Sequence, residues 1–334
     1  MPAQPVVVVL HGAQPPDRQL LRPVAERAEI RLVTEDQLAG ALPGADVLFA
    51  YDFANPVIGS VWSAADRLQW LHVAAAGVDA QLTPQVRDSD VVLTNSRGVF
   101  DGPIAEYVLA QVLAFAKDLA GSRRLQAEHQ WQHRESTRLA GTRALVVGTG
   151  NIGRAIARLL RAVGVDVTGA GRRARTDDPD FGTVVATDAM DDELGRADWV
   201  IAVAPLTKDS RGLFDAARFA AMTPRTHFIN VGRGELVDTD ALVAALQAGQ
   251  LAGAALDVVD PEPLPPGHPL WDLPQVAITP HNSGDFVGWQ DALTEVFVAN
   301  FERWVAGQTL QNVVDKSLGY VPNRPNSRSG HEAN

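Results

Sequence analysis

Three charged side chains follow apolar segments in the second half of the chain and could together move a proton. Arg233 lies in NVGRG, Glu262 in DVVDPEP and His281 in TPHN, each directly after a predicted strand. Because the carboxyl ends of parallel strands share one edge of a sheet, we expect these side chains to meet in one crevice. An imidazole exchanges protons near neutral pH, a carboxylate beside it orients the ring, and a guanidinium supplies a fixed positive charge. The set suits acid/base chemistry on a substrate that develops negative charge.

A glycine-rich turn lies upstream of these three segments. Gly148, Gly150 and Gly153 form a G-x-G-x-x-G pattern, directly after the apolar segment 144–147 and at the start of the amphipathic segment 154–162. In a strand-turn-helix unit these glycines allow a tight turn, close approach of a pyrophosphate and packing of the helix on the strand. An ordinary tight turn is the alternative, but the flanking strand and helix favour dinucleotide binding.

Basic residues follow the next predicted strand, 165–169. In NAD-dependent enzymes an acidic residue at the end of this strand holds the adenosine ribose, whereas here Gly171 is followed by Arg172 and Arg173. Guanidinium groups pair with a 2′-phosphate, which an acidic residue would repel. We therefore predict a preference for NADP(H), with NAD(H) as the alternative cofactor and a solvated basic loop as the non-functional interpretation.

Two series of apolar segments must position these groups. Each series alternates strand-like and helix-like stretches, which is typical of a parallel sheet covered by helices on both faces. The first series comprises 6–10, 30–33, 46–50, 68–73 and 91–94. The second comprises 144–147, 165–169, 199–203, 227–231, 254–257 and 276–279. A long helix from Pro103 separates the two series, and a last helix at 288–306 is expected to return to the first sheet.

The composition limits the classes of function. The 334 residues include 40 acidic and 29 basic side chains, and the formal charge of −11 disfavours nucleic acid and membrane surfaces as partners. The absence of cysteine excludes disulfides, thiolate nucleophiles and cysteine-based metal sites, and we expect no metal. The first apolar run is too short for a signal peptide, and no segment approaches the ~20 apolar residues of a membrane span. We therefore expect a cytoplasmic protein.

Taken together, the motifs resemble those of the D-isomer specific 2-hydroxyacid dehydrogenase family. The resemblance extends from AAGVD near residue 77 to the last helix, and it rests on GTGNIG, APLT, NVGRG, DVVDPEP and TPH in the same order. It implies an α/β fold of two Rossmann-like, doubly wound parallel-sheet domains with a cleft between them. Residues 1–98 with 285–334 would form the substrate-binding domain, and residues 99–284 the dinucleotide-binding domain.

The resemblance also implies a role for each candidate residue. Arg233 would bind the substrate carboxylate and carbonyl oxygen, His281 would be the acid/base and Glu262 its partner. Asp257 would accept hydrogen bonds from the nicotinamide carboxamide. The cofactor-binding residues would be Gly148, Gly150, Asn151, Ile152, Gly153, Arg172, Arg173, Pro205, Thr207, Val231 and Asp257. The substrate-binding residues would be Ala76, Gly77, Val78 and Arg233.

The pattern is most similar to that of the glyoxylate/hydroxypyruvate reductases, so we expect hydride transfer between NADP(H) and a small 2-keto or 2-hydroxy acid. Two departures from the family pattern matter. Val203 and Ala204 stand where the family often has a histidine, which leaves the cofactor contacts of that loop open. Residues 282–285 replace a small apolar run, which leaves the substrate open. The resemblance further implies a homodimer formed through the second domain, with the helix after Pro103 and residues 126–139 as contacts.

Two other functions remain as alternatives. The first is oxidation of a small anion, as in relatives of formate dehydrogenase, but those proteins pair the histidine with glutamine and this chain has Glu262. A neutral amide favours the imidazolium far less than a carboxylate does. The second is a non-catalytic, NAD(P)-sensing protein similar to the transcriptional corepressors, which share the fold and the cofactor motifs.

Overall fold

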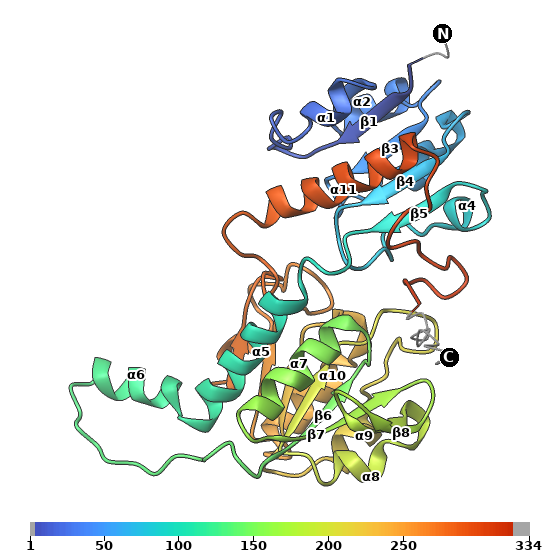
Figure 1. The fold of residues 1–334 in the computed structure, drawn as a ribbon. Helices are drawn as coiled ribbons and strands as arrows, with labels where there is room; N and C mark the ends of the chain where they lie inside the picture. The colour runs from blue at the N-terminus through green and yellow to red at the C-terminus, as the bar shows by residue number, and fades with distance from the viewer. Residues whose placement is uncertain (1–3, 323–334) are drawn as a thin grey trace, which may run out of the picture. The chain divides into compact units, whose positions relative to one another are not determined.

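The computed structural model describes residues 4–322, and residues 1–3 and 323–334, the two ends of the predicted first domain, lie outside the described residues. The chain divides into two compact units, each built around its own sheet (Figure 1). Unit 1 comprises the described residues up to Val99 and from Gly288 onward, and unit 2 comprises Phe100–Val287. Unit 1 is therefore assembled from two stretches that are far apart in sequence.

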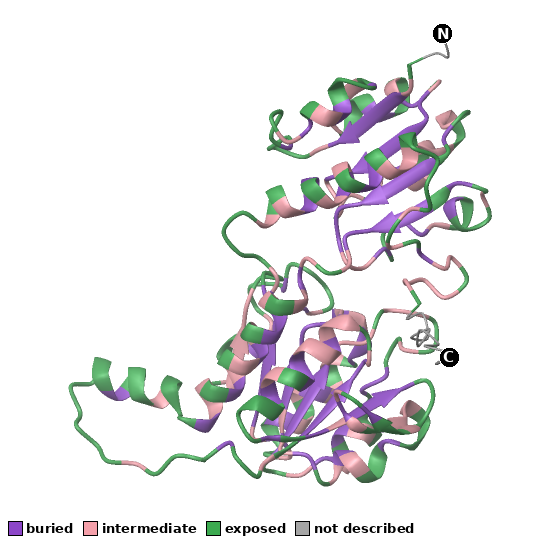
Figure 2. Cartoon of the chain, viewed as in Figure 1, coloured by how far each residue is buried: buried purple, intermediate pink, exposed green. Residues whose placement is uncertain are grey.

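Unit 1 contains a five-stranded parallel sheet in the order β2-β1-β3-β4-β5. Its strands are β1 (Val6–Leu10), β2 (Glu29–Val33), β3 (Val47–Ala50), β4 (Trp70–Val73) and β5 (Val92–Asn95). Its helices are α1 (Arg22–Ala25), α2 (Glu35–Ala41), α3 (Ile58–Val61), α4 (Pro84–Arg87) and α11 (Trp289–Val305), with a 3₁₀ turn η1 (Trp62–Ala64). The central strands are buried on both faces, which explains their uninterrupted apolar sequences (Figure 2).

Helix α11 packs on the unit 1 sheet, as the sequence predicted. The ring of Phe297 stacks on Phe49 of β3 with centroids 4.1 Å apart, and on Trp70 of β4 with centroids 5.3 Å apart. Stacked aromatic rings at these separations contribute beyond their buried area. The last long helix of the chain thus completes the core of the unit that the first strand begins.

Unit 2 contains an eight-stranded sheet in the order β13-β12-β11-β10-β6-β7-β9-β8. Its strands are β6 (Arg143–Val147), β7 (Asp166–Gly171), β8 (Arg175–Asp178), β9 (Gly182–Ala186), β10 (Trp199–Ala202), β11 (His227–Asn230), β12 (Gly253–Leu256) and β13 (Val276–Ile278). Its helices are α5 (Asp101–Ala116), α6 (Leu119–Ala127), α7 (Asn151–Ala162), α8 (Asp191–Leu194), α9 (Ala216–Ala221) and α10 (Thr239–Gln247), with 3₁₀ turns η2 (Thr187–Ala189), η3 (Gly234–Leu236) and η4 (Pro269–Asp272). The run β9-β7-β6-β10-β11-β12 has the 3-2-1-4-5-6 strand order of dinucleotide-binding sheets.

Every strand predicted from the sequence is present, with its ends shifted by at most two residues. The hairpin of β8 and β9 was not predicted. β9 pairs in parallel with β7, and β8 pairs antiparallel with β9 at the edge of the sheet. β8 has the sequence Arg-Thr-Asp-Asp, which lacks the apolar alternation by which a strand is recognised. Its place in the sheet depends on side-chain contacts that are described below.

Candidate active site

His281 and Glu262 form a direct pair at the carboxyl ends of β12 and β13. Glu262 lies in the loop after β12, and its Oε2 is 2.9 Å from Nδ1 of His281, in the turn after β13. An ionised carboxylate only accepts hydrogen bonds, so Nδ1 carries a proton and is the donor. Nε2 is then the ring atom available to a substrate. The two side chains are 46% and 38% exposed, so a small molecule can reach them.

The groups around Glu262 keep its carboxyl group ionised. Burial by itself would raise the pKa of Glu262, but the hydrogen bond and charge of His281 lower it, as do the N–H of Val259 and the charge of Arg233. The N–H of Val259 donates to Oε1 at 3.0 Å. The net result is a pKa of Glu262 below its ordinary value, so the carboxylate orients the imidazole throughout the neutral pH range.

Arg233 is positioned by the turn that follows β11. The buried side chain of Asn230 donates from Nδ2 to the carbonyl oxygen of Arg233 at 2.9 Å, and its Oδ1 accepts from the N–H of Gly232 at 3.1 Å. The guanidinium donates from Nη1 to the carbonyl oxygen of Gly232 at 2.8 Å. All three bonds lie within residues 230–233, and Asn230 is the last residue of β11, so the end of the strand sets the position of the Arg233 backbone.

Close packing brings the Arg233 turn against the loop that carries Glu262. A Cβ on Gly234 would lie 2.0 Å from the carbonyl carbon of Val259, so only glycine allows this approach. The NVGRG and DVVDPEP segments are therefore in contact, and the charge of Arg233 acts on Glu262. Within unit 2 the structure brings the Arg233, Glu262 and His281 segments together, as the sequence analysis expected of strands that end at one sheet edge.

The three positions of the G-x-G-x-x-G turn require glycine for different structural reasons. Gly148 has a φ of +123° and a Cβ there would lie 2.6 Å from the backbone nitrogen of Ala204, while a Cβ on Gly153 would lie 1.9 Å from the carbonyl oxygen of Gly148. Gly150 has an ordinary φ of −75°, and a Cβ there would have no atom within 4 Å. Packing of the chain on itself explains the first and third glycines but not the second. Close approach of a ligand at Gly150 would explain it, so the turn fits a dinucleotide pyrophosphate.

Helix α7 begins at Asn151, directly after Gly150. The N–H groups of Asn151 and Ile152 therefore belong to the first turn of a twelve-residue helix, where the macrodipole favours a bound anion. The phosphate-binding role of Asn151 and Ile152 stays a prediction, and their place at the start of α7 is compatible with it.

A side chain in place of Gly171, at the end of β7, would displace Thr149. Gly171 is buried, and a Cβ there would lie 2.9 Å from Oγ1 of Thr149, so a larger residue would force Thr149 to move. Arg172 and Arg173 follow directly and are exposed. The structure thus places two exposed guanidinium side chains, and no carboxylate, at the strand end where an NAD-dependent enzyme carries its acidic residue.

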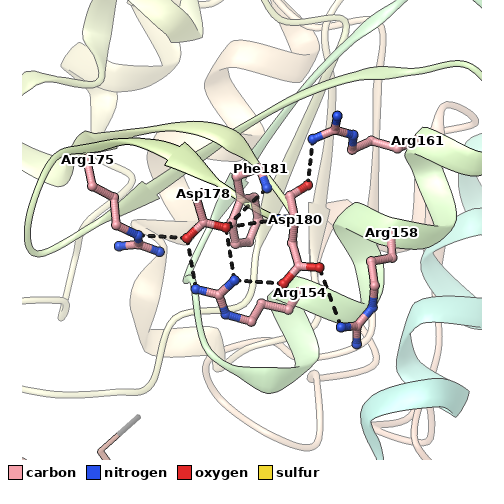
Figure 3. Close-up of polar contacts among 7 residues, drawn as sticks. All are labelled: Arg154, Arg158, Arg161, Arg175, Asp178, Asp180 and Phe181. Carbon is pink, nitrogen blue, oxygen red and sulfur yellow. Dashed lines mark hydrogen bonds and ion pairs between the residues drawn. The ribbon is translucent and has the colours of Figure 1, made fainter. Parts of the chain in front are cut away.

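Behind this loop, a cluster of ion pairs ties the β8–β9 hairpin to the start of α7 (Figure 3). Arg154 binds both oxygens of Asp178 at 2.9 Å, and Nε of Arg175 binds Oδ2 of Asp178 at 2.7 Å. The N–H groups of Asp180 and Phe181 donate to Oδ1. Burial would raise the pKa of Asp178, but the two guanidinium groups and the two N–H groups lower it far below its ordinary value. This cluster has no signal in the sequence, because Arg154 is 24 residues from Asp178 and the cluster carries no motif.

The other predicted cofactor residues lie at the ends of β10, β11 and β12. Pro205 and Thr207 are in the loop after β10, where the Ser210 hydroxyl donates to the Pro205 carbonyl oxygen at 2.7 Å and accepts from the Thr207 N–H at 2.8 Å. Val231 is buried directly after β11, and Asp257 is buried directly after β12. All four lie after strands of the same sheet as the glycine-rich turn.

The predicted substrate loop lies in unit 1, after β4. Ala76 and Gly77 are half-buried and Val78 is buried. The side chain of Asn95 donates from Nδ2 to the carbonyl oxygen of Ala76 at 2.5 Å, and the N–H of Ser96 donates to the carbonyl oxygen of Ala75 at 2.9 Å. The end of β5 therefore fixes the conformation of this loop.

Within residues 4–322, no helix combines the length and the apolar character that crossing a membrane requires. In the same residues, no group of three or more histidine, aspartate or glutamate side chains is arranged to hold a metal ion.

Comparisons with known proteins give consistent matches. A family model described as the D-isomer specific 2-hydroxyacid dehydrogenase, NAD binding domain, matches residues 109–283. An uncharacterized protein of Streptomyces coelicolor is 37% identical over 254 residues, which are 76% of this chain and 90% of that protein. A glyoxylate reductase of Thermofilum pendens is 28% identical over 270 residues, which are 79% of this chain and 80% of that protein.

Comparison with solved structures also finds a reductase of 2-keto acids. The NADPH-dependent glyoxylate/hydroxypyruvate reductase of Sinorhizobium meliloti, in complex with NADP and sulfate, superposes with a TM-score of 0.79 at 30% sequence identity. The match covers 95% of this chain and 100% of that one, so it includes both units.

Proposed function

Because the chain belongs to the D-isomer specific 2-hydroxyacid dehydrogenase family, whose members are NAD(P)-dependent oxidoreductases, we propose that it reduces small 2-keto acids with NADPH. The observation that carries this proposal is the pair of His281 and Glu262, 2.9 Å apart, beside the turn of Arg233. Unit 2 would bind the dinucleotide and unit 1 would supply the substrate loop.

The three side chains divide the chemistry of keto-acid reduction among them. When bound, reduced nicotinamide supplies the hydride. Negative charge then develops on the carbonyl oxygen of the substrate, and Nε2 of protonated His281 donates a proton to it. Glu262 holds the ring through Nδ1 and stabilises its charged form. Arg233 binds the substrate carboxylate and places positive charge near the developing oxyanion.

The substrate class follows from the same groups and from the relatives. Arg233 would bind a carboxylate of the substrate, so a 2-keto acid with a short side chain is the simplest candidate. The relatives named glyoxylate reductase and glyoxylate/hydroxypyruvate reductase support glyoxylate and hydroxypyruvate as the first compounds to test. Asp257 would accept a hydrogen bond from the nicotinamide carboxamide, and Pro205, Thr207 and Val231 would line the cofactor.

The proposed activity is tested by following NADPH absorbance with glyoxylate, hydroxypyruvate, pyruvate and longer 2-keto acids. We expect turnover with at least one of the short acids. Tight NADPH binding without turnover of any acid in the panel would contradict the proposal and would indicate a protein that senses the cofactor.

Cofactor preference gives a separate prediction. We expect kcat/KM with NADPH to exceed that with NADH by about tenfold or more, because charge-assisted hydrogen bonds from Arg172 and Arg173 to a 2′-phosphate contribute more than neutral ones. Replacing both arginines by alanine should remove this preference while changing kcat/KM for NADH less than about threefold. Arg87→Ala, at an exposed arginine of α4 in unit 1, is the matched control and should keep the NADPH/NADH ratio. Faster wild-type turnover with NADH would overturn the assignment.

We also propose that two copies of the chain associate through unit 2. Helix α6 and the segment that follows it extend away from the sheet of unit 2 (Figure 1). Nearly all residues of 126–138 are exposed (Figure 2). The side chain of Trp131 is 103% exposed. An aromatic side chain so fully in solvent is typical of an interface with a partner, and the family resemblance indicates a second copy.

Light scattering tests the association directly. We expect the mass of two chains for the wild type and a shift toward one chain for Trp131→Ala, since large aromatic residues dominate interface energies. A wild-type mass equal to one chain at micromolar concentration would contradict the dimer.

A further inference from the structure

The turn that carries His281 has a backbone conformation that needs support. His281 has a φ of +53°, in the left-handed region that non-glycine residues rarely occupy. Such a residue keeps its conformation only where surrounding contacts enforce it. Its N–H donates to the carbonyl oxygen of Asp257 at 2.8 Å, which ties the turn to the end of β12.

The carboxylate of Asp257 is the second support of this turn. It is 2% exposed, and its Oδ1 accepts from the N–H of Asn282 at 3.0 Å while its Oδ2 accepts from the N–H of Ser283 at 3.0 Å. Two consecutive N–H groups directly after His281 are therefore bound by one buried charge. Oδ2 accepts no other bond among the described residues.

A chain of two hydroxyl groups ends at this carboxylate. Oγ1 of Thr279 donates to Oδ1 of Asp257 at 2.6 Å, and Oη of Tyr107 lies 2.7 Å from the same Oγ1. Thr279 has one hydroxyl proton, which it donates in the hydrogen bond to the carboxylate. In the bond between the two hydroxyl groups, Tyr107 must therefore be the donor and Thr279 the acceptor. Burial raises the pKa of Tyr107, although its hydrogen bond with Thr279 opposes this, so the phenol stays protonated and available as a donor.

We propose that Tyr107 and Thr279 are positioning residues for His281: their directed hydrogen bonds fix the carboxylate of Asp257, and that carboxylate holds the strained turn in the geometry that proton transfer requires. This inference rests on the proposed role of His281 as the acid/base. Its physical basis is that a buried charge needs several donors to stay in place, and that a displacement of a catalytic group by about 1 Å costs up to 10²-fold in rate. Nothing in the sequence motifs assigns a role to Tyr107.

The test compares Thr279→Val, which removes the hydroxyl at constant shape, with Thr279→Ser, which keeps it. We expect Thr279→Val to lower kcat about 10- to 100-fold, because it cuts a hydrogen bond to a charged group, and Thr279→Ser to restore most of that loss. Tyr107→Phe should lower kcat about 3- to 10-fold. The KM for the keto acid should change less than about twofold, because these variants leave Arg233 intact.

Two readouts separate positioning from general destabilisation. In the Thr279→Val background, Tyr107→Phe should lower kcat by less than about twofold, because the chain of donors is already cut. Hydrogen exchange measured by mass spectrometry should become faster in peptides spanning 279–285 in Thr279→Val and Tyr107→Phe, and stay unchanged in a peptide spanning 144–153. Thr279→Ser should exchange as the wild type does.

The outcomes distinguish this inference from the proposed function. An active wild type whose Thr279→Val variant keeps kcat within twofold, or whose Tyr107→Phe effect is fully additive with it, overturns the inference alone. A wild type without keto-acid reduction overturns the proposed function, and unchanged exchange at 279–285 in both variants would then overturn the anchoring as well. Accelerated exchange confined to that segment would uphold the anchoring of the turn independently of turnover.

Discussion

Substitution of His281 by Asn should lower kcat for 2-keto acid reduction by about 10²–10⁴-fold, the usual contribution of a positioned acid/base group. Asparagine is the sharpest replacement because it tolerates the φ of +53° at this position, so the backbone is not further strained. Its amide can also occupy the place of Nδ1 and donate to Glu262. The variant therefore removes the proton at Nε2 while it keeps most of the surrounding hydrogen bonds.

The control for this variant is His268→Asn. His268 lies in the same unit, before η4, where its ring accepts a hydrogen bond from the N–H of Leu270, and asparagine is a good residue at such a helix start. We expect its kcat to stay within about twofold of the wild type. Dissociation constants for NADPH, measured by fluorescence, should be unchanged in both variants. A His281→Asn enzyme that keeps more than a third of the wild-type kcat would show that another group donates the proton.

Replacement of Arg233 by Ala should lower kcat/KM by about 10²–10³-fold or more, because it removes the anchor for the substrate carboxylate and the charge beside the oxyanion together. Both kcat and KM should change, in contrast to the variants at Thr279 and Tyr107. Arg233→Lys should recover only part of the loss, since an ammonium keeps the charge but cannot bind a carboxylate in the bidentate way of a guanidinium.

Arg225 provides a matched control at the opposite end of the same strand. It precedes β11, whereas Arg233 follows it, and it forms an ion pair with Asp198 in which its own side chain is 62% exposed. Exposed ion pairs contribute little to stability, so Arg225→Ala should leave kcat/KM within about twofold. Equal losses in Arg225→Ala and Arg233→Ala would mean that Arg233 supports the fold of unit 2 and does not act on the substrate.

Local sequence pattern predicted the parts of the molecule that depend on residues near each other in the chain. The apolar strands, the helix after Pro103 and the glycine-rich turn all follow from short-range periodicity or spacing. The convergence of Arg233, Glu262 and His281 was predictable for a related reason. Each follows a strand, and parallel strands end at one edge of the sheet, so chain position alone fixes their neighbourhood.

The contacts that fix the geometry of the site join residues that are far apart in the chain. Asp178 receives hydrogen bonds from Arg154 and Arg175 and so holds an edge hairpin whose first strand has no apolar pattern of its own. Tyr107 meets Thr279 across 172 residues of sequence. The pairs Arg154–Asp178 and Tyr107–Thr279 have no local signal in the sequence, because a polar side chain far from its partner is indistinguishable from a solvated one.

By itself, then, the sequence determined which chemical groups this protein has and at which strand ends they stand, because periodicity and turn residues act within a few positions. Only the tertiary structure decided that no contact within the chain requires a glycine at position 150. It also decided that His281 adopts a left-handed backbone conformation and that the buried carboxylate of Asp257 holds the turn of His281. Those features depend on distances between segments that packing alone brings together, and burial is what makes their few hydrogen bonds strong enough to matter.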